Sequence, residues 1–135
     1  MTHLLDSSAL LAHYLGESGR ERVQTLFEDA GAVLGTSVLA MFEFDSRLHQ
    51  LGMGAAEREN ELAKYRALLD EVVNVDEPVR IEAMKLRAAA STRISAMDVL
   101  IAASASLHEA RLIHRDPHFL VIPEPLLKQE FLPLK

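Results

Sequence analysis

Four acidic residues are placed where their carboxylates can act together: Asp6, Glu43, Asp98 and Asp116. Asp6 follows one short apolar run and Asp116 lies just beyond another, whereas Glu43 and Asp98 lie inside apolar stretches. A carboxylate in apolar surroundings is costly to desolvate, and such groups are usually paired or coordinate a metal. Hard divalent cations such as Mg²⁺ take oxygen ligands. We therefore predict that the four acids form one metal site.

Each acid also has a plainer structural interpretation. Asp6 and Asp116 each suit the N-cap of a helix, and Asp116 is followed by proline, which favours the first helical position. Ser95 and Asp98 have the spacing of a capping box, and Glu43 can simply point outward. Capping is the better explanation of Asp6, Asp98 or Asp116 taken alone, whereas Glu43 is harder to explain in this way. One shared metal site is the better explanation of the four acids taken together.

The elements that position these acids alternate between short β-rich runs and longer amphipathic ones. Strands are predicted at 3–5, 32–34, 72–75 and 112–113. Helices are predicted from residue 7 and over 17–30, 36–51, 55–71, 79–90 and 95–108, and the tail from Pro123 is expected to be irregular. This alternation predicts one α/β domain, residues 1–135, with a mostly parallel sheet flanked by helices. Ligands of such sheets bind in the loops at the carboxyl ends of the strands.

Composition limits the function classes. The 135 residues are 49% hydrophobic and 25% charged and contain no cysteine, which excludes a disulfide-stapled fold, a thiolate zinc site and a cysteine nucleophile. No signal peptide or membrane-spanning run is expected, so we predict a cytoplasmic protein. The net charge of −6 gives no global attraction to nucleic acid. It does not exclude a nuclease, because acids concentrated in a metal site lower the sum.

Four segments carry a family resemblance. In order, they are Leu4-Leu5-Asp6-Ser7-Ser8-Ala9-Leu10, Ser37 with Glu43 six residues later, Ser95-Ala96-Met97-Asp98-Val99-Leu100-Ile101-Ala102-Ala103-Ser104-Ala105, and Arg115-Asp116-Pro117-His118-Phe119. Together they resemble the successive motifs of a PIN domain over essentially the whole chain. The length is most similar to the VapC-type toxins of toxin–antitoxin pairs. The chain departs from the family at His114, where Thr or Ser is usual.

The resemblance implies a Mg²⁺- or Mn²⁺-dependent endoribonuclease with Asp6, Glu43, Asp98 and Asp116 as its catalytic acids. Asp6 and Asp98 are then the expected direct metal ligands, while Asp116 and Glu43 bind a second ion or act through water. The implied partners are RNA, a small VapB-type antitoxin and a second copy of the chain in a homodimer, with no membrane.

Three further residues are candidates for contacts to RNA. Ser7 and Ser8 lie at an expected helix start, where a hydroxyl can bind a ligand or a phosphate, and Arg115 adjoins Asp116. The plainer interpretations are helix-start serines and a solvated arginine. Without metal, like charges in the acid cluster are expected to raise the pKa of at least one carboxyl group.

Other functions remain open on the residues alone. A signalling receiver also has an acidic Mg²⁺ pocket, and Asp76 mimics its phospho-acceptor, but the paired acids after the first strand and the lysine after the last are missing. A non-catalytic PIN-fold binding module and an RNA-processing PIN nuclease that is not a toxin are the remaining alternatives. His114 and His118 are four residues apart, but no zinc motif accompanies them, so we expect structural or surface roles for both.

Overall fold

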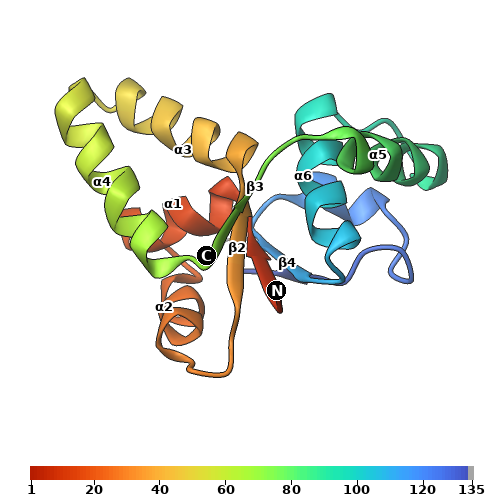
Figure 1. The fold of residues 1–135 in the computed structure, drawn as a ribbon, viewed down its shortest axis with the longest axis horizontal. Coiled ribbons are helices and arrows are strands. Elements are labelled where there is room, and N and C mark those ends of the chain that lie inside the picture. The colour runs from red at the N-terminus through yellow and green to blue at the C-terminus, as the bar shows by residue number, and fades with distance from the viewer. Residues whose placement is uncertain (134–135) are drawn as a thin grey trace.

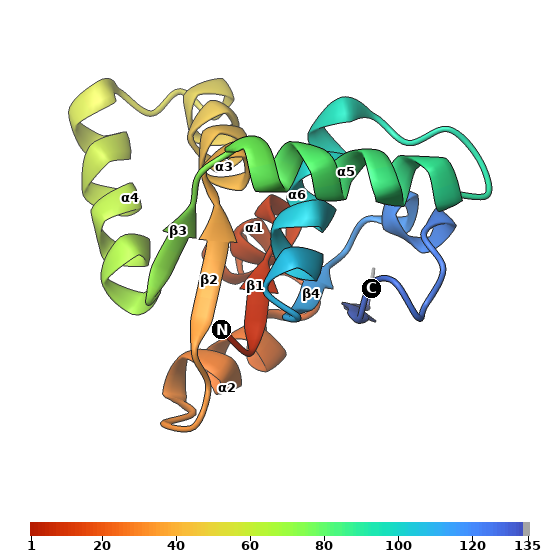
Figure 2. The same cartoon turned by 45° about the vertical axis from the view of Figure 1, so that its right-hand side comes forward.

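A parallel β-sheet forms the centre of the computed structural model, which describes residues 1–133. Within these residues the five strands are β1 (His3–Leu5), β2 (Leu34–Ser37), β3 (Glu71–Val73), β4 (Arg111–His114) and β5 (Gln129–Phe131). They lie in the order β3-β2-β1-β4-β5, and every neighbouring pair is parallel. Figures 1 and 2 show β1 in the middle of the sheet. All five carboxyl ends therefore lie at one edge of the sheet.

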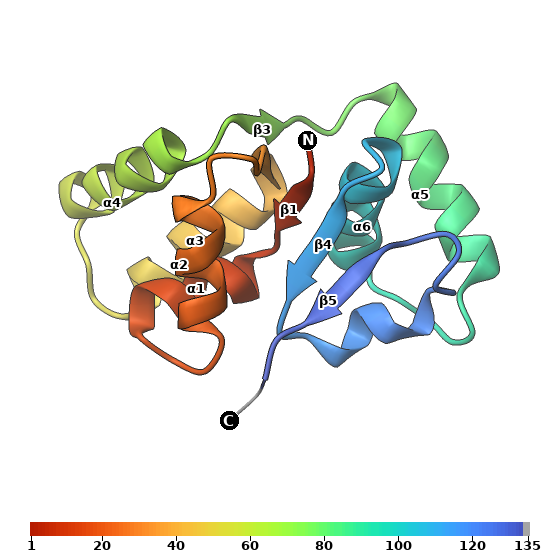
Figure 3. The same ribbon diagram turned by 90° about the horizontal axis from the view of Figure 1, so that it is seen from below.

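Helices cover both faces of the sheet. The α-helices within residues 1–133 are α1 (Ser7–Leu15), α2 (Arg20–Glu28), α3 (Val38–Gln50), α4 (Ala55–Leu68), α5 (Glu77–Ala89) and α6 (Ala96–Leu107), and the 3₁₀ turn η1 spans Pro117–Val121. Helices α1 to α4 lie on one side, and α5 and α6 lie on the other (Figure 3). No helix among the described residues is long and apolar enough to cross a bilayer.

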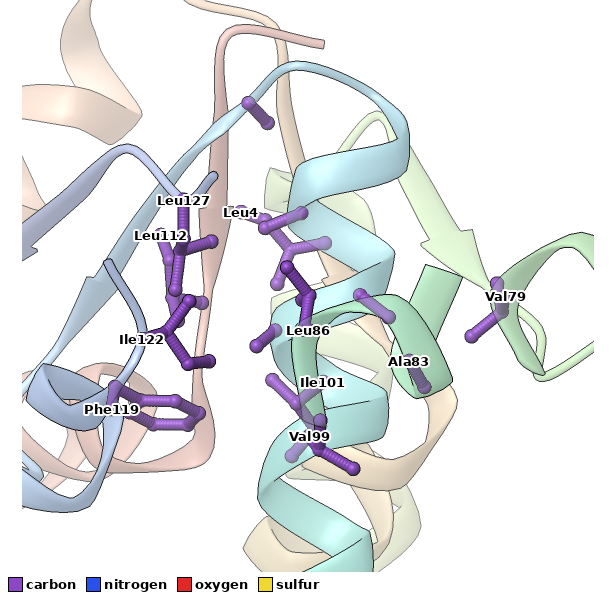
Figure 4. Close-up of a cluster of buried hydrophobic side chains, with 14 of the residues drawn as sticks. Leu4, Val79, Ala83, Leu86, Val99, Ile101, Leu112, Phe119, Ile122 and Leu127 are labelled. Carbon is purple, nitrogen blue, oxygen red and sulfur yellow. The ribbon is translucent and has the colours of Figure 1, made fainter. Parts of the chain in front are cut away.

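Alternation along the two central strands divides the core in two. Leu4 and Leu112 belong to the cluster that α5 and α6 cover, whereas Leu5 and Ile113 belong to the cluster under α1 to α4. Figure 4 shows the first cluster, with the sheet leucines facing Leu86 and its neighbours. All these side chains are fully buried. The sheet beneath the acids is thus packed on both faces, as a parallel sheet requires.

The predicted α/β class with a parallel sheet flanked by helices is confirmed, but some boundaries are wrong. Strand β2 begins at Leu34 instead of residue 32, because a turn held by the Asp29 carboxylate occupies the preceding positions. It continues through Thr36, whose hydroxyl donates to the Leu5 carbonyl oxygen at 2.6 Å inside the sheet. Helix α3 accordingly begins at Val38, and α4 ends at Leu68 before β3.

The tail from Pro123 is not wholly irregular. Residues 129–131 form β5, which pairs in parallel with β4. This short edge strand is partly exposed and lacks an apolar run, so the sequence pattern did not indicate it. The predicted domain extends to residue 135, and its last two residues lie outside the described part of the chain.

Candidate metal centre

The four predicted acids meet at the carboxyl edge of the sheet. Asp6 directly follows β1 and Asp116 follows β4, and these strands are neighbours. Glu43 lies in the second turn of α3, which begins where β2 ends, and Asp98 lies in the first turn of α6. The charge of Asp116 acts on both Glu43 and Asp98, and that of Glu43 acts on Asp6. The structure therefore brings together the acids that the sequence singled out.

Asp6 both caps α1 and contributes to the site. Its Oδ2 accepts hydrogen bonds from the Ser8 backbone N–H at 3.2 Å and from the Ser8 hydroxyl at 2.6 Å. Its Oδ1 is buried and has no hydrogen-bond partner within the described residues. Burial, the main cause, raises the pKa of Asp6 to about 7. A buried acceptor without a donor is uncommon, and a cation supplies the interaction that is missing.

Glu43 is half-buried, and its Oε1 accepts a hydrogen bond from the Ser7 hydroxyl at 2.9 Å. Burial is the main cause that raises its pKa, and the negative charges of Asp98 and Asp116 raise it further. The Ser7 hydroxyl acts in the opposite direction because it stabilises the ionised form. The carboxyl group of Glu43 therefore holds a proton more readily than an ordinary glutamate.

Asp98 and Asp116 lie close to each other, with His118 beside them. One ligand atom from each of the three side chains lies within 4.8 Å of the other two. Burial raises the pKa of Asp98, and the charge of Asp116 adds to this. Ser95 accepts from the Asp98 backbone N–H at 3.1 Å, so the predicted cap of α6 is also present. The expected rise in carboxyl pKa is confirmed, with burial, more than charge repulsion, as its first cause.

The two serines hold the acids in place. Ser8 accepts from the Arg115 backbone N–H at 2.9 Å while its hydroxyl donates to Asp6, and this ties the end of β4 to the end of β1. The Arg115 side chain pairs with Glu17 at 3.0 Å. The contacts of Ser7, Ser8 and Arg115 to RNA stay predictions, but all three residues adjoin the acids.

His114 is a structural residue, as expected. Its ring is fully buried, and Nδ1 accepts from the Asp116 backbone N–H at 3.1 Å. This leaves Nε2 to donate to Oε1 of Gln129 at 2.8 Å. Burial lowers the pKa of His114, which favours the neutral ring. An imidazole nitrogen thus supports the turn into Asp116 where the family commonly has a hydroxyl.

His118 lies at the surface, as expected, but its contact with two of the acids was not predicted. Its Nδ1 lies 2.9 Å from Oδ1 of Asp116 and 3.9 Å from Oδ2 of Asp98. Asp116 caps η1 by accepting from the His118 backbone N–H, and this tight turn directs the imidazole back toward the acid two residues earlier. The four-residue spacing of His114 and His118 does not identify the partners of His118, which are the carboxylates of Asp98 and Asp116.

The sequence matches one known protein family over most of its length. The sequence profile described as PIN domain matches residues 3–125. This chain belongs to the PIN domain family. The comparison with curated proteins gives no match.

Solved structures share this PIN fold at low sequence identity. VapBC2 from Rickettsia felis, bound to a promoter DNA fragment, has 18% identity and a TM-score of 0.77, with 98% of this chain and 100% of that chain covered. VapBC-1 from nontypeable Haemophilus influenzae has 18% identity and a TM-score of 0.74, with coverage of 97% and 98%. VapC20 from Mycobacterium tuberculosis, a toxin that cleaves the sarcin–ricin loop, has 17% identity and a TM-score of 0.67, with coverage of 88% and 93%.

Two hollows flank the acids of this PIN domain. One of about 420 Å³ is lined by Ser7, Glu43, Phe42 and Arg47, among others. The other, of about 500 Å³, is lined by Arg93, Ser95, Asp98 and His118, among others. Each hollow thus combines one of the four acids with one arginine, which brings positive charge next to the acidic cluster.

Proposed function

We propose that this PIN domain is a metal-dependent endoribonuclease. The observation that carries the proposal is the placement of Asp6, Glu43, Asp98 and Asp116 at one edge of the sheet, with a buried Asp6 oxygen that has no hydrogen-bond partner within the described residues. Asp98 and Asp116 form the tightest part of this set, together with His118. Such an all-carboxylate set fits Mg²⁺ or Mn²⁺, the ions that the family resemblance implies. The neighbour VapC20, which is described as an RNA-cleaving toxin, supports the same reaction class.

Within this proposal, Asp6, Asp98 and Asp116 hold the metal. A bound divalent ion lowers the pKa of a coordinated water and neutralises charge on the phosphate. Glu43 is kept in place by Ser7, and its raised pKa makes it a stronger proton acceptor for water than an ordinary glutamate. Arg47 and Arg93 line the flanking hollows, and we expect their positive charges to contact phosphates of a bound RNA.

Cleavage of RNA by the purified chain tests this function. We expect cleavage that requires Mg²⁺ or Mn²⁺ and that is lost in Asp98→Asn, because this change keeps the shape of the side chain and removes one negative charge. Asp76→Asn is the matched control, since Asp76 caps α5 through the Val79 N–H and asparagine caps as well. An Asp98→Asn protein that cleaves at the wild-type rate contradicts the site assignment.

The strand order and the same cleavage assay address the alternative functions. In a receiver, the phospho-acceptor follows the middle strand of the sheet. Asp76 instead follows the edge strand β3, with β2 between that strand and β1. No divalent-dependent cleavage by a folded wild-type protein favours a non-catalytic binding module.

We further propose that the chain is the toxin of a VapBC-type pair and that an antitoxin segment inhibits it. The acids form a receptor for a guanidinium group, because one arginine can bind two carboxylates bidentately. Beside them, Phe42 is 62% exposed and Leu15 is 37% exposed, and both border hollows that Leu11 lines too. An amphipathic helix that carries an arginine fits this combination.

A homodimer is the remaining partner proposal. Ile81 and Met84 leave more than half of their side chains exposed on α5, which is a suitable contact for a second copy. Sedimentation of the purified chain measures this, and a monomer at all concentrations contradicts it.

A further inference from the structure

His118 is distinguished from the other histidines by its position. Its side chain is 75% exposed, yet its Nδ1 is directed at two carboxylates instead of solvent alone. The contact with Asp116 is an ion pair when the ring is protonated, and it also brings Nδ1 next to two acids of the predicted metal site. The position of His118 therefore has to be considered together with Asp98 and Asp116.

The spacing of the three side chains fits one coordination sphere. Ligand atoms at about 2.1 Å from an ion lie about 3 Å apart when adjacent and about 4.2 Å apart when opposite. The Nδ1 atom of His118 lies 2.9 Å from one carboxylate oxygen and 3.9 Å from the other, and the whole set lies within 4.8 Å. These separations are compatible with all three atoms binding one ion.

We propose that His118 is a nitrogen ligand of the ion held by Asp98 and Asp116, and that it biases this site toward Mn²⁺ over Mg²⁺. Imidazole suits first-row transition metals, whereas Mg²⁺ prefers oxygen and retains its waters. The inference rests on the proposed metal site and adds a ligand to it. It does not depend on the identity of the RNA.

Metal binding by the full-length chain tests the proposal without RNA. Calorimetric titration with Mn²⁺ and with Mg²⁺ measures the affinity for each ion. We expect His118→Asn to weaken Mn²⁺ binding about tenfold and Mg²⁺ binding less than about threefold, because the amide places an oxygen near the position of Nδ1. His108→Ala is the control, since His108 lies at the opposite end of α6 from Asp98.

Electron spin-echo spectroscopy of bound Mn²⁺ gives a direct readout of the ligand. The wild-type protein is expected to show modulation from a coordinated ¹⁴N nucleus, and His118→Asn is expected to lose it while His108→Ala retains it. An imidazole that only neutralises the carboxylates gives no such modulation, and that result overturns the proposal. Equal losses of Mg²⁺ and Mn²⁺ affinity in His118→Asn overturn the predicted bias.

The two proposals fail in different ways. If the protein binds Mn²⁺ through nitrogen but does not cleave RNA, the nuclease function is wrong and the ligand assignment stands. If RNA is cleaved and the Mn²⁺ spectrum lacks ¹⁴N modulation, the nuclease function stands and His118 is not a ligand.

Discussion

The Ser7 hydroxyl donates a 2.9 Å hydrogen bond to Oε1 of Glu43, which joins the first residue of α1 to the second turn of α3. Ser7 is buried, so water does not readily replace its hydroxyl. The bond stabilises the ionised carboxylate against the effect of burial. Ser7 therefore influences both the position and the proton affinity of Glu43.

Ser7→Ala is expected to lower kcat/KM for RNA about tenfold and to move the activity–pH profile to higher pH, because the pKa of Glu43 rises further when the hydrogen bond is lost. Stability should fall by only about 1 kcal/mol, the net contribution of one such bond. Ser46→Ala removes another hydroxyl from the same hollow and serves as the control. A Ser7→Ala enzyme with the wild-type pH profile contradicts this role.

The buried Asp6 predicts how the metal-free protein responds to pH. Its pKa is about 7 in the folded chain and about 3.8 when unfolded, so the folded state binds the proton more tightly. Stability from this group is therefore lost as pH rises from about 4 to about 7, by an amount of order 4 kcal/mol, and stays constant above that range.

Asp6→Asn removes this ionisation and keeps a good N-cap. Without metal, we expect the variant to melt roughly 10 °C above the wild type near pH 8. The difference should be less than half as large near pH 5, because only part of the stability loss has occurred at that pH. Thermal melts at both pH values measure it, and equal melting near pH 8 shows that Asp6 is not held in a site that penalises its charge.

Metal binding should offset the stability that is lost when the buried Asp6 ionises. An ion that binds only the folded state stabilises it by RT ln(1 + [M]/Kd), which is about 2.7 kcal/mol at a hundredfold excess over Kd. We expect millimolar Mg²⁺ or Mn²⁺ to raise the melting temperature of the wild type and to have little effect on Asp98→Asn. Ca²⁺-free and chelator-treated samples define the baseline. Equal shifts in both proteins place the bound ion elsewhere.

The location of the acids was predictable because parallel strands end at one edge of the sheet. The competing capping interpretation of Asp6 is also correct. The cap uses Oδ2, which leaves Oδ1 without a hydrogen-bond partner among the described residues, so one carboxylate can serve both roles. Capping and metal binding therefore do not exclude each other when the helix begins directly after a strand.

The features that sequence reasoning missed depend on three-dimensional details. Strand β5 is identified by its pairing with β4 and not by an apolar run. The approach of His118 to Asp116 depends on the 3₁₀ turn between them. Burial raises the pKa values of the acids more than charge repulsion does, and the depth of a carboxylate in the fold is not given by spacing along the chain.

Substitutions at His114 test how much this residue, which departs from the family pattern, contributes to stability. His114→Ala removes the hydrogen-bond partners of the Asp116 N–H and of Oε1 of Gln129 and opens a cavity, at a cost of about 3 kcal/mol. The stability of His114→Asn is expected to lie between those of His114→Ala and the wild type, because the asparagine amide oxygen can accept a hydrogen bond from the Asp116 N–H. Denaturant melts measure both, with the exposed His49→Ala as control. An unchanged His114→Ala stability contradicts the assigned hydrogen bonds.

Expression without the neighbouring gene tests the toxin assignment. A nuclease with an open acidic site should arrest growth when it is produced alone, and Asp98→Asn should remove the arrest at equal protein level. Co-expression of the adjacent small protein should restore growth. Substituting the partner's arginine that contacts the acids should abolish this protection, because the guanidinium competes for the carboxylates that hold the metal.

Phe42→Ser, at an exposed apolar position beside the acids, should weaken the complex without changing RNA cleavage by the free chain. Harmless expression of a folded wild-type protein that cleaves RNA in vitro, with no small partner co-purifying from its native source, excludes the toxin role and leaves an RNA-processing nuclease.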